Sequence, residues 1–179
     1  MANTAPLNDL IQQVGKFTPE QRAQTIIGID PGGTTGVFAI DHTTLETLGQ
    51  AQLQTKTISQ AQENFTVWLH KTLEFLDPCR PTVFVVEDYR VYAHKQQQHV
   101  FSDLHTPQLI GALKWFAHDL GFPVVLQNAQ TAKNFLSDKK LKDWGFHQRG
   151  KGHAMDATRH ALYFAIFGNK HFNPPKTGE

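Results

Sequence analysis

Acidic and imidazole side chains in three distant segments have the types and positions expected of a site that holds a divalent cation. Asp30 and Glu87 each close an apolar run, and His153 and Asp156 lie three residues apart at the start of an alanine-rich segment. A charged group at the end of a buried strand is costly unless it is paired or holds a cation. Carboxylate oxygens with one imidazole nitrogen suit Mg²⁺ or Mn²⁺. These four residues are therefore the candidate site.

Asp30 and Glu87 each stand where an apolar run meets a polar segment. Side chains alternate along a strand, so Gly28 shares a face with Asp30 and is expected to leave that face open near the carboxylate. An aspartate before the Gly/Thr turn at 31–36 also fits a turn cap, which is a purely structural role. Glu87 is followed by Asp88, and the run before them is apolar on both faces. Its periodicity therefore does not decide which of these two acids faces the site.

The third segment has the spacing of a helix with one polar edge. His153, Asp156 and His160 are three or four residues apart, so they share a helix face. Four alanines on the same segment would allow close packing against a sheet: Ala154, Ala157, Ala161 and Ala165. A lone histidine in such a position is more often a surface or core residue than a ligand. The weight on His153 comes from its three carboxylate companions.

Strands and helices that could position these residues follow one another along the chain. Strands are expected at 25–30, 35–40, 47–56, 81–87 and 122–126. Helices are expected from a Ser59–Gln62 capping box to about residue 77, at 106–119 with Thr106 as N-cap, from Asn128 to 137, and at 153–167, with a basic loop at 138–152. An opening meander followed by strand–helix units predicts an α/β fold, a mixed five-stranded sheet with helices on both faces.

Length and composition indicate one domain at 25–170, with an N-terminal extension at 1–24 that holds one short helix and a C-terminal tail at 171–179. The 179 residues include a single cysteine, which excludes an internal disulfide framework and fits a reducing cytoplasm. No secretory signal and no apolar run long enough to span a membrane is present in the sequence. A basic stretch on this near-neutral chain could bind nucleic acid or be a solvated loop. Its cations are Lys133, Lys139, Lys140, Lys142, Arg149 and Lys151.

Three motifs together resemble the RuvC family of Holliday junction resolvases, particularly its bacteriophage-type members. They are Gly28-Ile29-Asp30-Pro31-Gly32 with Thr35-Gly36, then Val86-Glu87, then His153-x-x-Asp156-Ala157 with His160-Ala161-Leu162. The resemblance spans residues 25–167. It implies an RNase H-like fold, a homodimer, and cleavage of branched DNA such as a four-way junction with Mg²⁺ or Mn²⁺, two per subunit. By position, Asp30, Glu87 and Asp156 match the catalytic acids, and His153 matches a fourth metal position that is often an acid.

Under this resemblance, two cations held by the carboxylates would drive phosphodiester hydrolysis, with Asp30 bridging them. His153 could be a metal ligand, a proton carrier or a bystander. The family's Gly- and Lys-containing segment has a short match at 150–152, with Lys151 at its centre, and Lys133, Lys139, Lys140 and Lys142 are further DNA-binding candidates. Tyr89, Arg90, Tyr92, His94 and Lys95 form an aromatic and basic segment suited to an unpaired base, although both tyrosines could instead pack on the domain. The helix at 106–119 is the candidate subunit interface.

Three other functions compete with this interpretation. The pattern Asp30-x-Gly32-x-Thr34 also resembles the phosphate-binding hairpin of the actin, sugar-kinase and heat-shock chaperone group, but those proteins need a second lobe for which 179 residues leave no room. A nuclease acting on RNA, similar to the rRNA-processing relatives of RuvC, is a closer alternative. A structure-specific DNA-binding protein without catalysis is a third, and the retention of all four ligand positions argues against it.

Overall fold

A computed structural model describes residues 5–14, 23–74, 80–89 and 105–168 of the chain. The strands are β1 (Thr25–Asp30), β2 (Thr34–Asp41), β3 (Thr47–Gln54), β4 (Thr82–Glu87) and β5 (Val124–Gln127). The helices are α1 (Ala5–Val14), α2 (Ile58–Leu73), α4 (His105–Asp119), α5 (Ala129–Phe135), α6 (Asp138–Asp143) and α7 (Gly152–Tyr163), which continues into the π-helical turn η3 (Phe164–Gly168).

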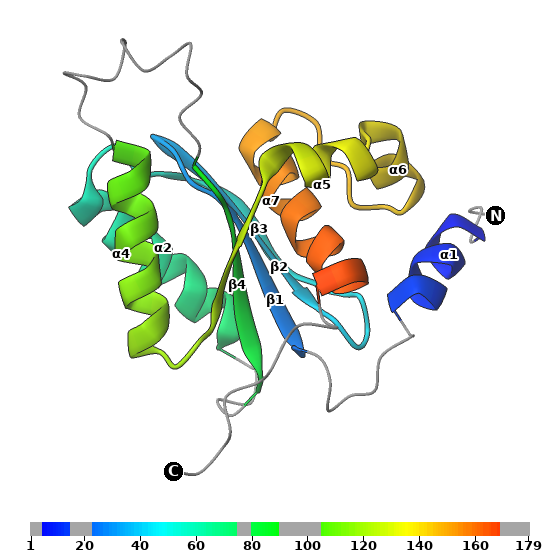
Figure 1. Ribbon diagram of the computed structural model, residues 1–179, viewed down its shortest axis with the longest axis horizontal. Coiled ribbons are helices and arrows are strands. Elements are labelled where there is room, and N and C mark those ends of the chain that lie inside the picture. The colour runs from blue at the N-terminus through cyan, green and yellow to red at the C-terminus, as the bar shows by residue number, and fades with distance from the viewer. Residues whose placement is uncertain (1–4, 15–22, 75–79, 90–104, 169–179) are drawn as a thin grey trace.

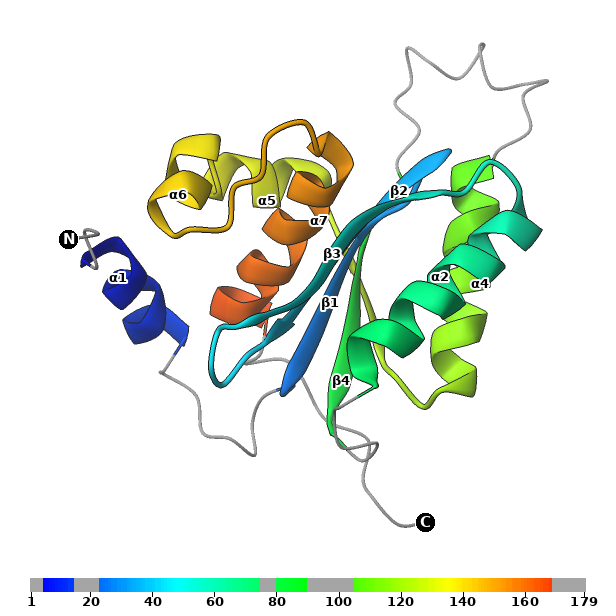
Figure 2. The same ribbon diagram turned by 180° about the vertical axis from the view of Figure 1, so that it is seen from behind.

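The strands form one mixed sheet in the order β3-β2-β1-β4-β5. Strands β1, β2 and β3 are an antiparallel meander, while β4 pairs in parallel with β1 and β5 pairs in parallel with β4. Helices α2 and α4 cover one face, and α7 covers the other together with α5, α6 and α1 (Figures 1 and 2). The predicted mixed five-stranded sheet with helices on both faces is confirmed.

Each face of the sheet has its own apolar core, because side chains alternate along the buried strands. Ile26 and Val85 pack on the α7 side with Leu162. Ile27 and Phe84 belong to the core under α2 and α4. Glu87 continues the alternation of Val85, so the β4 register turns its side chain toward α7.

Helix α7 lies unusually close to the sheet because two glycines remove the side chains beneath it. A Cβ at Gly28 would overlap the backbone oxygen of Ala157, and a Cβ at Gly36 would overlap the backbone of His153. The face at Gly28 was expected to be open, but α7 itself fills that space. The alanines expected to permit this approach are fully buried: Ala154, Ala157, Ala161 and Ala165. The first turns of α7 are thereby fixed against β1 and β2.

Several element boundaries differ from the sequence-based prediction for local reasons. Helix α2 begins at Ile58, with Thr57 as N-cap accepting from the Gln60 amide, so the Ser59–Gln62 capping box is wrong. The Gln60 side chain instead accepts from the Lys56 amide. Two equivalent Ser/Thr-x-x-Gln patterns overlap here, and only packing decides between them.

Two further predictions on helices also need correction. Helix α4 begins at His105, so Thr106 is inside the helix and is not its N-cap. The segment 138–152, predicted as a loop, starts with α6, which Ser137 caps by accepting from the Lys140 amide. A helix this short is difficult to detect because fewer than two turns give no hydrophobic period.

Helix α1 is the short helix expected in the N-terminal extension. Its Leu10 and Val14 are buried in the core on the α7 side, and α1 contacts η3. In the part of the chain that the structure describes, no helix is long and apolar enough to cross a membrane.

Candidate active site at one end of the central strands

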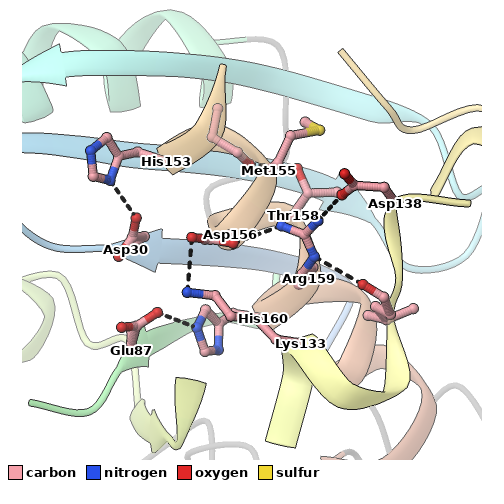
Figure 3. Close-up of polar contacts among 12 residues, drawn as sticks. Asp30, Glu87, Lys133, Asp138, His153, Met155, Asp156, Thr158, Arg159 and His160 are labelled. Atoms are coloured by element: carbon pink, nitrogen blue, oxygen red, sulfur yellow. Dashed lines mark hydrogen bonds and ion pairs between the residues drawn. The ribbon is translucent and has the colours of Figure 1, made fainter. Parts of the chain in front are cut away.

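The four candidate residues lie together at one end of the sheet. Strands β1 and β4 run in parallel with Ile29 opposite Val86, so Asp30 and Glu87 emerge at the same edge. The first turns of α7 place His153 and Asp156 above them, as Figure 3 shows. Three segments that are far apart in the sequence therefore meet at one site. The side chain of Glu87 contacts α7 through His160, while Glu87 and Asp88 both line the cavity described below.

Asp30 is buried and bonded to one partner. Its Oδ2 atom is 2.8 Å from Nδ1 of His153, whose own side chain is 52% exposed. Burial, and then the charge of Glu87, raise the pKa of Asp30 to about 6, although the hydrogen bond from His153 opposes them. Asp156 adds to the rise. A carboxylate in this position is short of positive charge, which is the condition that favours a bound cation.

Asp156 is held by two basic side chains. Lys133 Nζ, on α5, is 3.0 Å from Oδ2, and Arg159 Nη1 is 2.6 Å from Oδ1. Arg159 also pairs with Asp138 and donates from Nε to the Leu136 carbonyl oxygen. The guanidinium therefore ties α7 to the start of α6. A planar guanidinium suits this role because its donors point in fixed directions.

Lys133 carries its positive charge into the acidic cluster. Burial alone would lower its pKa, but the hydrogen bond and charge of Asp156 outweigh burial and raise it, and Glu87 and Asp30 contribute in the same direction. The ammonium therefore stays charged beside all three acids. The sequence placed Lys133 among the DNA-binding candidates, whereas the structure places its side chain inside the acid cluster (Figure 3).

Glu87 is held from beneath α7 by a buried histidine. His160 has no solvent exposure, and its Nε2 atom is 3.0 Å from Oε2 of Glu87. Its Nδ1 atom is 2.6 Å from Oε1 of Gln127 on β5. The polar edge of α7 predicted from the spacing therefore does reach the acids.

A polar cavity of about 240 Å³ opens beside Glu87. Its walls come from the ends of β1 and β4 and from the starts of α4 and α5. They are Pro31, Glu87, Asp88, Tyr89, Thr106, Asn128 and Ala129. The acid cluster therefore borders a space into which a ligand could enter.

The donor set fits a hard divalent cation: three carboxylates, of which Glu87 and Asp156 raise the pKa of Asp30, with an imidazole beside them. In the ranges that the structure describes, no three His, Cys, Asp or Glu side chains are arranged as a ready-made metal site. Each acid instead engages a nitrogen donor. His153 on Asp30 and Lys133 on Asp156 are partly exposed, whereas Arg159 on Asp156 is largely buried. His153 and Lys133 are thus the groups that an entering cation would meet first.

Of the remaining DNA-binding candidates, Tyr89 lies at the cavity and the described lysines lie on α6 or just before α7. Tyr89 lines the cavity beside Glu87. Arg90, Tyr92 and Lys95, with His94, lie outside the described residues. Lys139 pairs with Asp143, and Lys140 lies over the rings of Phe135 and Trp144. Lys142 is on α6, and Lys151 is the residue before α7.

Sequence reasoning missed the partners that hold the acids. Arg159 follows Asp156 by three residues, so helical spacing could have suggested their ion pair. Gln127 closes β5 opposite Glu87, but its contact with His160 joins segments 33 residues apart and leaves no sequence signal.

Comparison with solved structures identifies the fold. The Thermus thermophilus RuvC in complex with a Holliday junction substrate has a TM-score of 0.58 and 22% identity, over 81% of this chain and 94% of that one. The Thermus thermophilus RuvC structure has a TM-score of 0.54 and 20% identity, over 84% of this chain and 99% of that one. The yeast mitochondrial Holliday junction resolvase has a TM-score of 0.45 and 15% identity, over 91% of this chain and 86% of that one. No family model and no curated protein sequence matches. The chain therefore has a RuvC-like, RNase H-like fold.

Proposed function

We propose that this protein is a structure-specific endodeoxyribonuclease that resolves Holliday junctions. The observation that carries the proposal is the meeting of Asp30, Glu87 and Asp156 at one end of a RuvC-like sheet, beside an open polar cavity. A solved RuvC with this fold is in complex with a Holliday junction substrate. The three sequence motifs together support a place among the bacteriophage-type members, and the single cysteine supports a cytoplasmic setting.

The proposed cofactors are Mg²⁺ or Mn²⁺, two per subunit, held by Asp30, Glu87, Asp156 and His153. When bound, such cations supply a more acidic water and neutralise charge on the leaving 3′-oxygen. The protein's own contribution is to gather three acids where water is partly excluded. Lys133 adds a fixed positive charge beside the position that a phosphate would take. His153, exposed and bonded to Asp30, can accept or release a proton at Nδ1 once that contact is broken.

DNA contacts would come from the cationic side chains of α6 and of the residue before α7. Lys139, Lys140, Lys142 and Lys151 are proposed to contact phosphates, which position a duplex without reading its sequence. Tyr89, at the cavity wall, is placed to stack on an unpaired base. Arg90, Tyr92 and Lys95 remain proposed contacts in the same segment. Because a junction is defined by its geometry, shape would outweigh base contacts in recognition.

A homodimer is the proposed assembly, with α4 at the subunit interface. Leu109, Ile110 and Leu113 are buried under α4, but Trp115 is 66% exposed. Trp115 and Phe116 line an apolar groove of about 230 Å³ between α2 and α4. A two-fold dimer would present two sites to the two matching strands of a junction. Sedimentation of the wild type and of Trp115→Glu tests this assembly, and a monomeric wild type would contradict it.

One cleavage experiment tests the activity itself. The protein is incubated with Mg²⁺ or Mn²⁺ and a four-way junction, a flap, a linear duplex and a structured RNA of matched sequence. We expect paired nicks in opposite strands of the junction and an uncut duplex. Preferential cutting of the RNA would support the rRNA-processing type of nuclease instead. Junction binding without any cleavage in either metal would support a non-catalytic DNA-binding protein.

A further inference from the structure

Among the described side chains that hold an acid of the site, His160 is the one with no solvent exposure; Arg159, on Asp156, is 12% exposed. The exposed fraction of His160 is 0%, whereas the side chains of His153 and Lys133 are 52% and 41% exposed. Solvent or a cation can displace the last two from Asp30 and Asp156. The imidazole of His160 has no such freedom, since it lies between α7 and the sheet with Gln127 on its other side.

The direction of the hydrogen bonds follows from the chemistry of the partners. A carboxylate can only accept, so His160 must donate from Nε2 to Oε2 of Glu87, over 3.0 Å. The Gln127 amide, 2.6 Å from Nδ1, can accept from this atom or, with its amide reversed, donate to it. In both arrangements the Nε2–H group of His160 points at Glu87.

The strand register makes this chain of contacts a rigid unit. Glu87 and Gln127 are directly paired on the neighbouring strands β4 and β5, and α7 passes over them. His160 therefore closes a link from β5 through α7 back to β4. The hydrogen bond uses only one of the lone pairs of Oε2, so the Glu87 carboxylate keeps acceptor positions for a cation.

We propose that His160, supported by Gln127, is a positioning residue that holds Glu87 ready as the preformed cation ligand of the site. Asp30 and Asp156 then complete the site when the exposed side chains of His153 and Lys133 move away, while Arg159 keeps its pair with Asp156. This inference rests on the proposed function, because it states which acid of the proposed cation site is in position before the cation binds. Partners that orient a metal ligand typically change metal affinity by 10–100-fold when they are removed.

The test measures Mn²⁺ binding by calorimetry on the whole protein without DNA, for the wild type, His160→Leu and His160→Gln. We expect His160→Leu to bind Mn²⁺ 10–100-fold more weakly, and His160→Gln, which keeps an N–H donor, to recover most of that loss. Junction binding without metal should be unchanged in both variants. Raising the Mg²⁺ concentration should restore part of the cleavage rate of His160→Leu, because positioning affects affinity before it affects the chemical step.

The matched control is His42, the second buried histidine among the described residues, which is 1% exposed and hydrogen-bonds through Nε2 to the Ala165 carbonyl oxygen. We expect His42→Leu to lose stability without a change in the Mn²⁺ dissociation constant. If His160→Leu is too unstable to study, Gln127→Leu removes the support of His160 from a half-buried position and should weaken Mn²⁺ binding several-fold.

Three results would overturn the inference, and only the third also contradicts the proposed function. Unchanged Mn²⁺ affinity in His160→Leu, or an equal loss in His42→Leu, contradicts the positioning role while leaving the proposed nuclease intact. A wild type that binds no Mn²⁺ and cuts no junction contradicts both.

Discussion

The pKa of a buried carboxylate is shifted in opposite directions at the two ends of the β1–β2 pair. At the Thr25 end, Asp41 accepts hydrogen bonds from the amides of Thr43 and Thr44 and pairs with Arg80. Burial alone would raise its pKa, but the two amides and Arg80 outweigh burial and hold the pKa below its ordinary value. At the other end, burial and the neighbouring acid Glu87 raise the pKa of Asp30 to about 6.

The difference separates a structural charge from a functional one. At the Asp41 end the chain supplies all the positive charge and donors that the carboxylate needs. At the Asp30 end it gathers three acids, and the one hydrogen-bond partner of Asp30, His153, is 52% exposed. A folded protein tolerates such a deficit where a ligand completes it, so the unbalanced end is the candidate active site.

The largest effect on stability is expected where α7 packs on the sheet, because this contact brings His153 and Asp156 to the Asp30 end. Gly28→Ala places a Cβ against the backbone of Ala157, so α7 must move. We expect a loss of about 3 kcal/mol in the free energy of unfolding, measured in urea, and loss of junction cleavage. The control is Gly111→Ala on α4, where nothing lies within 4 Å and helix propensity favours alanine. A Gly28→Ala protein as stable as this control would contradict the packing described.

The next effect is a gain in stability at the active end. Asp30→Asn removes a carboxylate whose pKa rises from 3.8 to about 6 on folding. Folding therefore favours the protonated acid, and its destabilising effect is absent below about pH 4 and complete above about pH 6. We expect Asp30→Asn to be about 2–3 kcal/mol more stable than the wild type at pH 7, with the difference vanishing near pH 4.

Asp41→Asn is the reciprocal experiment at the other end. Its lowered pKa stabilises the fold above the ordinary carboxyl pKa, and this stabilisation is lost as the pH falls through the folded value. The variant should therefore be less stable than the wild type at pH 7, and the difference should shrink on acidification. If Asp30→Asn and Asp41→Asn changed the free energy of unfolding in the same direction at pH 7, the contrast between the two ends would be wrong.

A smaller loss is expected when the balancing cation is removed. Arg80→Met leaves Asp41 without its ion pair and Thr25 without a donor, in a region that is mostly buried. We expect a loss of about 2 kcal/mol, seen as a lower urea midpoint. The cleavage rate per folded molecule should not change, because this end does not touch the site. A selective fall in that rate would show that the two ends are coupled.

The smallest effect is expected at the exposed pair on α6. Lys139→Ala breaks a solvent-exposed ion pair with Asp143, so stability should change by less than about 0.5 kcal/mol. If Lys139 contacts phosphate, junction affinity should fall at low salt and its salt dependence should become shallower. An unchanged salt dependence would remove Lys139 from the DNA-binding surface.

The sequence predicted the sheet, the helices on its faces and the meeting of the four candidate residues, because strand ends and helix period are local signals. It did not choose Glu87 over Asp88 by periodicity, since both faces of β4 are buried. It did not predict the ion pair of Lys133 with Asp156, because that contact depends on the packing of α5 against α7. The contact of His160 with Glu87 likewise exists only once β4 and α7 are packed together.

The most direct test of the central claim is cleavage and binding of a four-way junction by Asp30→Asn beside the wild type, with Mg²⁺ or Mn²⁺ present. We predict that the wild type nicks the junction, while Asp30→Asn binds it with unchanged affinity and does not cut it. Because this variant is expected to be the more stable of the two, unfolding cannot explain the loss. Normal cleavage by Asp30→Asn would contradict the assignment of this end of the sheet as the active site.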